Sequence, residues 1–201
     1  MFDFPRLEAA MRRRVPMDRL PHVYGVVETA LDLARKYGGD PDRVRAAALM
    51  HDYAKALPPE ELLSLGRRFG LIIDLAEEEN PELLHGSVGA ALLEEEGLIT
   101  DPEVLSAIRW HTTGTPGMSL LDQIIWLADL IEPTRRFPGV EEIRAAAWKD
   151  LSLGMLTGLD HTLTYLIRTG RRIHLKTVET RNWLLSRVQS AGQAAPSPAR
   201  V

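Results

Sequence analysis

Residues 44–55, VRAAALMHDYAK, are the stretch from which the fold of this chain can be inferred. Val44, Ala47 and Ala48 recur at offsets of three and four residues, which is typical of a helix with one buried face. His51 continues that face and Asp52 follows it, so an imidazole and a carboxylate are expected to be buried together. Burying an ionised carboxylate costs several kcal/mol unless it is paired or binds a metal. The stretch therefore predicts a helical segment, ended by Pro58-Pro59, whose buried face carries a polar pair with a chemical role.

Other segments also place a histidine or an aspartate on the apolar face of a predicted helix, among them IIWLADLIE at residues 124–132. Six side chains share this placement, four of the six histidines and two aspartates: His22, His51, His85, His111, Asp52 and Asp129. Taken singly, a histidine can be a hydrogen-bonded core residue, Asp129 a carboxylate bonded to backbone N–H groups, and Asp52 a partner of Lys55. As a set they favour one shared cause, because each separate explanation would have to hold at once.

A metal centre is such a cause. Asp129 has no Arg or Lys within four residues on its predicted helix, and Lys55 would leave one oxygen of Asp52 free. Imidazole and carboxylate are usual ligands of Fe, Mn, Co and Zn. Six ligands exceed what one catalytic ion with open positions needs, so we expect two ions with Asp52 between them. Such a pair suits phosphoanhydride hydrolysis, which needs a nucleophile at neutral pH and neutralisation of oxygen charge.

Helix signals fill the rest of the sequence. Asp40-Pro41, Asn80-Pro81 and Asp101-Pro102 each combine an N-cap with a first-turn proline, and Ser119 is the expected cap of the helix that contains Asp129. No strand alternation, fixed-period repeat or glycine-rich phosphate loop is present. The sequence therefore predicts an all-α fold.

The C-terminal third predicts a long helical stretch and a last helix. The stretch is expected from about residue 140 to 169, interrupted near Gly154 or Gly158, and the last helix from 177 to 188. Linker-like composition, rich in Pro, Ala and Ser, occurs only at the end. We therefore expect a single domain over residues 1–190 and a disordered tail over 191–201.

Composition restricts the class of protein. The chain has 201 residues, 45% hydrophobic and 26% charged, which is enough for a self-sufficient core. It has no cysteine, which excludes a disulfide scaffold, a thiolate metal site and a cysteine nucleophile. A net charge of −4 provides no broad attraction to nucleic-acid polymers or membranes. With no apolar run of membrane-spanning length and charges where a signal peptide would be apolar, we expect a cytoplasmic protein.

The HDYAK motif, the upstream helical histidine and the aspartate of LADLIEP resemble the HD-domain superfamily of metal-dependent phosphohydrolases. Longer motifs narrow the resemblance: LLHGSVGA, IRWHTTG, GMSLLDQIIWLADLIEPTRRFPGV and IHLKTVETRN. From about Arg19 to Asn182 the chain resembles the YqeK family of bacterial HD-domain proteins, the symmetrical diadenosine-tetraphosphate hydrolases. This resemblance implies an HD-domain helical bundle with a dinuclear metal site in its core.

The resemblance also implies roles for single residues. Positions that bind one iron correspond to His22, His51, Asp52 and Asp129, and positions that bind the second correspond to His85 and His111 together with Asp52. Asp52 and Lys55 are the implied catalytic residues, Lys55 matching a phosphate-contacting position. The implied nucleotide contacts are Arg135, Arg172, Ile173, His174, Leu175, Lys176, Thr177 and Arg181. Leu175 stands where a proline is common and His161 where an asparagine is common.

The implied reaction is attack of water on an inner phosphate of diadenosine tetraphosphate, giving two ADP. Its implied cofactors are two divalent ions, iron in the first place and Mn or Co otherwise, and a homodimer is an assembly that the helices with apolar residues all round allow. Three other functions stay open: an HD-type nucleoside monophosphate phosphatase, an HD-type diiron oxygenase, and a regulatory module that binds a nucleotide without turnover.

Overall fold

The computed structural model describes residues 1–72 and 74–193, with side chains up to residue 190. Within these ranges the chain forms helices and no strand, so the predicted all-α fold is confirmed. The α-helices are α1 (Phe4–Arg14), α2 (Leu20–Tyr37), α3 (Pro41–Met50), α4 (Pro59–Arg68), α5 (Leu75–Glu79), α6 (His85–Glu95), α7 (Pro102–Trp110), α8 (Leu120–Ile131), α9 (Val140–Lys149), α10 (Leu151–Arg168) and α11 (Leu175–Gln193). Two 3-10 turns, η1 (Met17–Arg19) and η2 (Pro81–Leu84), precede α2 and α6.

Local sequence signals explain where several helices begin. The Asp40 side chain accepts hydrogen bonds from the backbone N–H groups of Asp42 and Arg43 at the start of α3, and Asp101 caps α7 in the same way. Ser119 and Asp122 form a reciprocal capping box at the start of α8. These caps satisfy N–H groups that have no partner within the helix, and they fix the entry points of the helices that carry the site.

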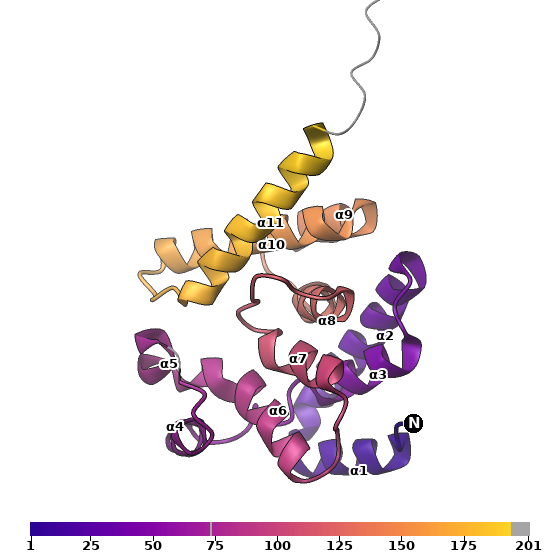
Figure 1. The fold of residues 1–201 in the computed structure, drawn as a ribbon, viewed down its shortest axis with the longest axis vertical. Helices are drawn as coiled ribbons and strands as arrows, with labels where there is room; N and C mark the ends of the chain where they lie inside the picture. Colours follow the sequence, from indigo (N-terminus) through magenta and orange to yellow (C-terminus); the bar gives the residue numbers. More distant parts are fainter. Residues whose placement is uncertain (73, 194–201) are drawn as a thin grey trace, which may run out of the picture.

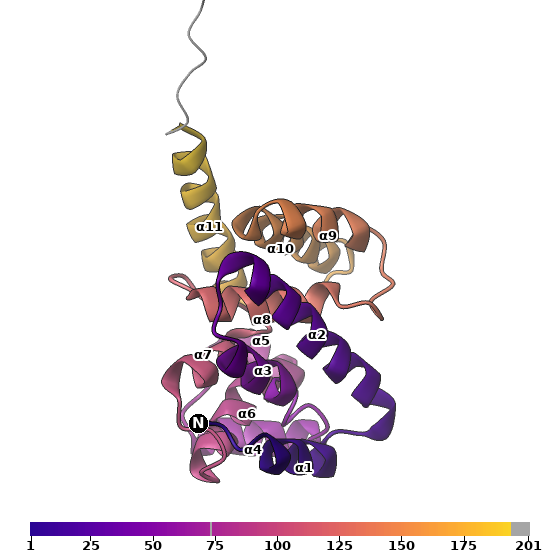
Figure 2. The ribbon, with the colours of Figure 1, turned by 90° about the vertical axis from the view of Figure 1, so that its right-hand side faces the viewer.

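Helix α8 is the centre of the bundle. It packs against α2, α3 and α7 on one side and against α9 and α10 on the other. Figures 1 and 2 show it between these two layers, with α11 crossing α10 and extending beyond the body of the molecule. Leu127 and Ala128 are fully buried beside Asp129. An apolar surface on nearly all sides therefore accounts for the central position of α8.

The break in the long C-terminal stretch lies at Asp150, not near Gly154 or Gly158 as expected. Asp150 has an extended backbone, ends α9 and caps α10 by accepting from Leu153 N–H. Gly154 is a helical residue of α10. A side chain does not fit there because α9 and α10 approach closely: a Cβ atom at this position would stand 2.5 Å from Ala147 Cα. This glycine serves packing rather than chain reversal.

Other boundaries also differ from the expectation. Asn80-Pro81 opens the 3-10 turn η2, and α6 begins only at His85. Helix α11 runs from Leu175 to Gln193, longer than the expected 177–188, so residues 191–193 of the expected tail belong to it. Residues 194–201, the remainder of that tail, lie outside the described residues.

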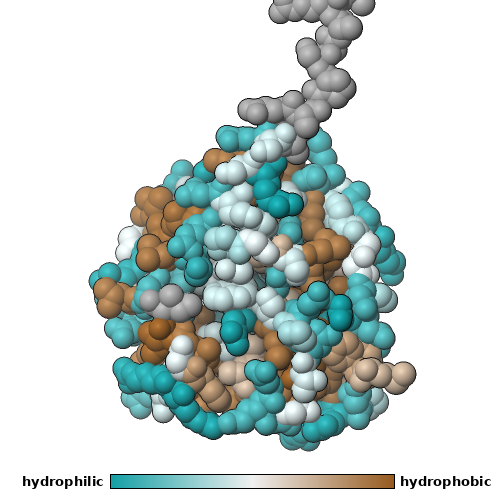
Figure 3. All heavy atoms as spheres, in the orientation of Figure 1, coloured by the Kyte–Doolittle hydropathy of each residue, from teal (hydrophilic) through white to brown (hydrophobic). Residues whose placement is uncertain are grey.

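The surface is mixed in character. On the face shown in Figure 3, hydrophilic residues alternate with separate hydrophobic patches. None of the helices in the described ranges has both the length and the apolar composition that a bilayer crossing requires.

Candidate metal centre

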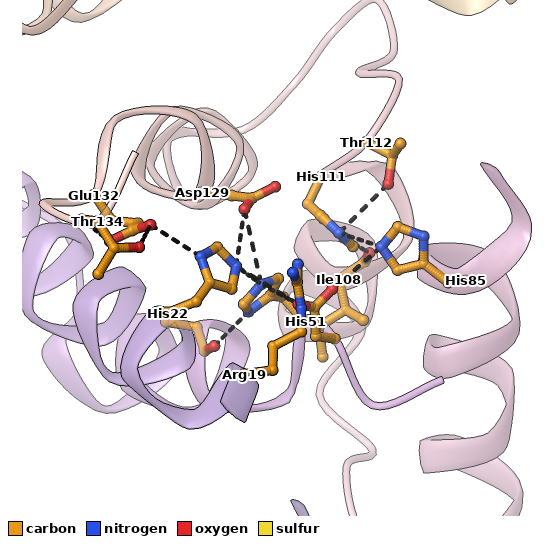
Figure 4. Close-up of polar contacts among 12 residues, drawn as sticks. Arg19, His22, His51, His85, Ile108, His111, Thr112, Asp129, Glu132 and Thr134 are labelled. Carbon is orange, nitrogen blue, oxygen red and sulfur yellow. Dashed lines mark hydrogen bonds and ion pairs between the residues drawn. The ribbon is translucent and has the colours of Figure 1, made fainter. Parts of the chain in front are cut away.

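Five separate segments bring the six predicted residues together. Figure 4 labels five of them, all except Asp52. His22 lies in the first turn of α2, His85 is the first residue of α6, and Asp129 lies near the end of α8. His51 and Asp52 directly follow α3, and His111 directly follows α7. After α3 the backbone forms successive turns, in which the N–H groups of Tyr53 and Lys55 donate to the carbonyl groups three residues earlier, those of Met50 and Asp52.

One group of potential ligands comprises His22, His51 and Asp129, whose donor atoms all lie within 4.8 Å of one another. His22 Nε2 is 3.2 Å from Asp129 Oδ1 and 3.3 Å from His51 Nε2. His22 and His51 are buried, and Asp129 is partly exposed. Two imidazole nitrogens and a carboxylate oxygen thus face a common point.

A second group comprises Asp52, His85 and His111, again within 4.8 Å and all buried. His85 Nε2 lies 2.9 Å from His111 Nε2 and 3.3 Å from Asp52 Oδ1. The other oxygen of this aspartate, Oδ2, is 3.3 Å from His51 Nε2. Asp52 therefore lies between the two groups, the position expected of a bridging carboxylate.

The hydrogen bonds of the imidazoles show that the donor set fits metal ions. The Nδ1 atoms of His51, His85 and His111 lie 2.7, 2.5 and 2.7 Å from the carbonyl oxygens of Ala48, Glu82 and Ile108. His22 Nδ1 lies 3.1 Å from Glu132 Oε1. Carbonyl and carboxylate oxygens only accept, so each Nδ1 is the protonated donor, and in a neutral ring Nε2 then carries a lone pair. The Nε2 atoms of His22 and His51 are 3.3 Å apart, and those of His85 and His111 are 2.9 Å apart. Lone pairs at such distances repel unless a cation lies between them. Metal-binding histidines usually have this arrangement, with one ring nitrogen donating to an oxygen and the other facing the metal.

Electrostatics in the centre favour a bound cation. Burial opposes ionisation of Asp52, but His51 and His85 outweigh it and hold its pKa well below the usual range. Burial likewise opposes ionisation of Asp129, but His22, His51 and Arg135 lower its pKa. Burial, with His85 and His51 nearby, lowers the pKa of His111 to about 3, so this ring is neutral near pH 7. The site therefore combines ionised carboxylates with a neutral imidazole, which suits divalent metals.

Two arginines contact the aspartates from outside the ligand groups. Arg19 Nε donates to Asp52 Oδ2 at 2.6 Å, and Arg135 Nη2 donates to Asp129 Oδ1 at 2.5 Å. Arg135, for which the resemblance implies a nucleotide contact, here also donates to the backbone oxygen of Asp129 at 2.8 Å. The sequence did not predict either ion pair. Arg135 lies beyond the end of α8, and Arg19 is 33 residues from Asp52, so neither arginine shares a helix with its aspartate.

Lys55 follows Asp52 by three residues, and its backbone N–H donates to the Asp52 carbonyl group. It is half-buried and makes no ion pair with any residue in the described ranges, including Asp52. The alternative explanation of Asp52 as a partner of Lys55 is therefore not supported, because Arg19 takes that position. Among the residues that the structure describes, no carboxylate is paired with the ammonium group of Lys55.

A cavity of about 570 Å³ adjoins the His85–His111 end of the centre. Thr112, which lines it, has its hydroxyl oxygen 3.4 Å from His111 Nε2, and Glu82, also in the wall, accepts the bond from His85 Nδ1. Its lining comes from α5, η2, the segment after α7, α10, and the segment before and at the start of α11. The lining residues are Ala76, Glu79, Asn80, Glu82, Leu83, Thr112, Thr113, Thr162, Leu166, Arg171, Arg172, His174 and Thr177.

The structure places the predicted nucleotide contacts unequally around this cavity. Arg172, His174 and Thr177 line it, and Ile173 is partly exposed between them. Leu175 is 63% exposed, so this departure from the family pattern lies at the surface. The basic groups are already paired: Arg172 with Glu79, which also lines the cavity, Lys176 with Glu179 and Arg181 with Asp160. His161 lies apart from the centre and bonds Pro138 O at 2.7 Å.

A third cluster, Asp74, Glu77 and His174, has a structural explanation. The carboxylate of Asp74 accepts from Ala76 N–H at the start of α5 and from Leu175 N–H at the start of α11. Glu77 accepts from Asp74 N–H and lies 3.4 Å from His174 Nε2. These contacts join α5 to the start of α11, two of the elements that line the cavity.

Comparison with known proteins identifies the class. Residues 19–134 match the family model of the HD domain, so the chain is an HD-domain protein. A solved structure from Clostridium acetobutylicum, described as a predicted HD superfamily hydrolase involved in NAD metabolism, superposes with a TM-score of 0.88 at 40% identity. It covers 93% of this chain and 99% of that one.

Three curated relatives narrow the assignment. They are named symmetrical bis(5'-nucleosyl)-tetraphosphatase, from Bacillus subtilis (39% identical, 89% of this chain and 95% of the relative), Halalkalibacterium halodurans (44%; 83% and 89%) and Staphylococcus aureus (36%; 86% and 89%). The chain belongs to this family of symmetrical bis(5'-nucleosyl)-tetraphosphatases, the YqeK type, and the resemblance seen in the sequence motifs is confirmed.

Proposed function

We propose that this chain is a metal-dependent hydrolase that cleaves diadenosine tetraphosphate symmetrically into two ADP. The observation that carries the proposal is the pair of adjacent ligand groups joined by Asp52. A cavity of about 570 Å³ lies next to them, since Glu82 and Thr112 in its wall contact His85 and His111. The names of three relatives that match most of the chain support the same activity over a monophosphate phosphatase or an oxygenase. All six donor residues are present, which argues against a regulatory module without turnover.

The two groups would hold two divalent ions, His22, His51 and Asp129 the first, His85 and His111 the second, with Asp52 shared. Iron is our first choice, with Mn or Co as alternatives, because nitrogen and oxygen ligands accept several divalent metals. Such ions supply Lewis-acid stabilisation of phosphoryl oxygens and make water acidic enough to react near neutral pH.

Cationic side chains of the chain would neutralise the remaining phosphate charge. Lys55 makes no ion pair with a carboxylate in the described ranges and follows Asp52 by three residues, so its ammonium group can reach a phosphate at the same centre. Arg135, which bonds Asp129, and Arg19, which bonds Asp52, lie at the edges of the centre, about 30% exposed. Together with the ions these groups suit a transition state that spreads negative charge over phosphoryl oxygens.

The cavity would hold one ADP half of the substrate. Its volume is within the range of about 300–1,000 Å³ typical of small-molecule sites. Contacts from residues 172–177 and Arg181 require their present ion pairs to open, and exposed pairs contribute only about 0–1 kcal/mol each. A polyphosphate can therefore compete for these cations.

Product identification tests the activity directly. The purified chain is loaded separately with Fe²⁺, Mn²⁺ or Co²⁺, incubated with diadenosine tetraphosphate, and the products are separated by anion exchange. We expect ADP as the sole nucleotide product. ATP together with AMP would contradict the symmetrical cleavage. In a separate incubation with AMP as substrate, release of free phosphate would favour the monophosphate phosphatase. A cytoplasmic location and a homodimer stay predictions, the second testable by light scattering.

A further inference from the structure

Glu132 is a fully buried carboxylate at the end of α8, three residues after Asp129. Its Oε1 atom accepts from His22 Nδ1 at 3.1 Å and from the Thr134 hydroxyl, and its Oε2 atom accepts from the Thr134 backbone N–H at 2.6 Å. Donors on both oxygens favour the charged form of a carboxyl group. Figure 4 shows Glu132 and Thr134 on the far side of His22 from the other imidazoles.

The surrounding chain is shaped to keep this carboxylate in place. Gly25 lies one turn after His22 on α2, and a Cβ atom there would stand 2.7 Å from Glu132 Oε2. Arg144 donates to the carbonyl oxygens of Ile131 and Glu132 at 2.8 and 2.7 Å, which holds the backbone that follows α8. Gly25 of α2 thus leaves space for the Glu132 carboxylate, and Arg144 of α9 holds the Glu132 backbone.

His22 differs in this respect from the other imidazoles of the centre. His51, His85 and His111 each donate Nδ1–H to the backbone carbonyl three residues earlier, a neutral acceptor provided by the local turn. His22 alone among them uses a charged side chain from a distant helix. A carboxylate acceptor makes the opposite nitrogen of an imidazole a stronger ligand than a neutral carbonyl does.

We infer that Glu132 is a positioning residue that acts through His22 and makes the group of His22, His51 and Asp129 bind its ion more tightly than the group of Asp52, His85 and His111. The inference rests on the proposed metal centre, but not on the substrate. Glu132 orients the ring of His22, keeps the proton on Nδ1, and directs the Nε2 lone pair toward Asp129 and His51.

Mn²⁺ titration of the metal-free protein, with free Mn²⁺ followed by electron paramagnetic resonance, tests the inference. The wild type should bind two ions with unequal affinity. Glu132→Gln, which keeps the volume and an acceptor oxygen but removes the charge, should weaken the tighter site about 10- to 100-fold and leave the other unchanged. Gly25→Ala should produce the same pattern by displacing the carboxylate.

Matched controls separate this effect from general damage. Glu8→Gln makes the same chemical change in a carboxylate that accepts from Tyr24 of α2, and Gly89→Ala adds a methyl group whose nearest neighbour would be 3.6 Å away. Both should bind Mn²⁺ as the wild type does. ¹⁵N NMR of the histidine rings without metal gives a second readout, in which Glu132→Gln should perturb His22 most.

Two results would overturn the inference: unchanged binding at both sites in Glu132→Gln and Gly25→Ala, or an equal loss at both sites in variants whose melting curves show a folded protein. A wild type that binds two Mn²⁺ ions but releases no ADP would refute the proposed reaction and leave the role of Glu132 standing.

Discussion

Asp52 places one carboxylate oxygen beside each ligand group. Its Oδ1 lies 3.3 Å from His85 Nε2, and its Oδ2 lies 3.3 Å from His51 Nε2 and 2.6 Å from Arg19 Nε. At the scale of the residue, this arrangement makes Asp52 the one side chain in the described ranges that joins the two groups and also contacts a cation from outside them.

Asp52→Ala should remove metal binding and activity together. We expect activity to fall by more than about 100-fold, the upper end of the loss when a metal ligand is deprived of a hydrogen-bond partner. Metal content by elemental analysis and ADP release check the result. Asp32→Ala, which removes an exposed carboxylate paired with Arg35 on α2, is the control. Normal turnover by Asp52→Ala would refute the metal mechanism.

Lys55→Met should affect the substrate and spare the metal. Hydrogen bonds to charged groups contribute about 1.5–3 kcal/mol, so we expect kcat/KM to fall about 10- to 100-fold with unchanged metal content. Lys36→Met, at a lysine that lies over the ring of Tyr37, should have wild-type kinetics. Loss of bound metal in Lys55→Met would show that Lys55 supports the centre instead of the substrate.

At the scale of elements, helix ends carry the chemistry. His51 and Asp52 follow the last turn of α3, His111 follows α7, and His85 begins α6. Backbone carbonyls at such ends are available as acceptors for the Nδ1–H groups of these histidines. The packing of α8 between the two layers then brings Asp129 to the same point. The distances between the six donor residues therefore depend on how closely the helices that carry them pack.

Gly154→Ala tests that dependence away from the site. The added methyl carbon would stand 2.5 Å from Ala147 Cα, a backbone atom that cannot move without shifting α9. We expect the free energy of unfolding to fall by about 1–3 kcal/mol, measured by urea denaturation. Gly89→Ala, where the nearest atom would be 3.6 Å away, should be neutral or up to about 1 kcal/mol more stable. Equal stability of both variants would contradict the close crossing.

At the scale of the whole molecule, metal binding and folding are coupled. The six donor residues come from five segments spread between residues 22 and 129, and they converge only in the folded chain. A ligand that binds only the folded state stabilises it by about 2.7 kcal/mol at 100 times its Kd. The bundle without metal should therefore be folded but less stable.

A chelator should lower Tm by about 5–10 °C, since about 1 kcal/mol corresponds to about 2–4 °C for a domain of this size. Differential scanning calorimetry with and without EDTA measures the shift, and added Mn²⁺ should restore it. Asp52→Ala should show little further shift with EDTA. Identical Tm values for the wild type in both conditions would show that the centre does not hold metal in solution.

The sequence by itself determined the all-helical class and the burial of five of the six polar side chains, Asp129 being partly exposed. Caps such as Asp40 and Ser119 act within four residues, so they can be recognised locally, and helical periodicity places His51 and Asp129 on apolar faces. Buried imidazoles and carboxylates need partners, and this is why six residues on apolar helix faces could be selected from the sequence as candidate ligands; their binding of metal stays a prediction.

Only the tertiary structure decided which groups those side chains meet. His22 and Glu132 are 110 residues apart in sequence, and Asp52 pairs with Arg19 rather than with nearby Lys55. The break at Asp150, the close approach at Gly154 and the cavity beside His111 likewise arise where distant segments pack. Local patterns report which face of a helix is buried, whereas the identity of its neighbour depends on contacts that no short window of sequence contains.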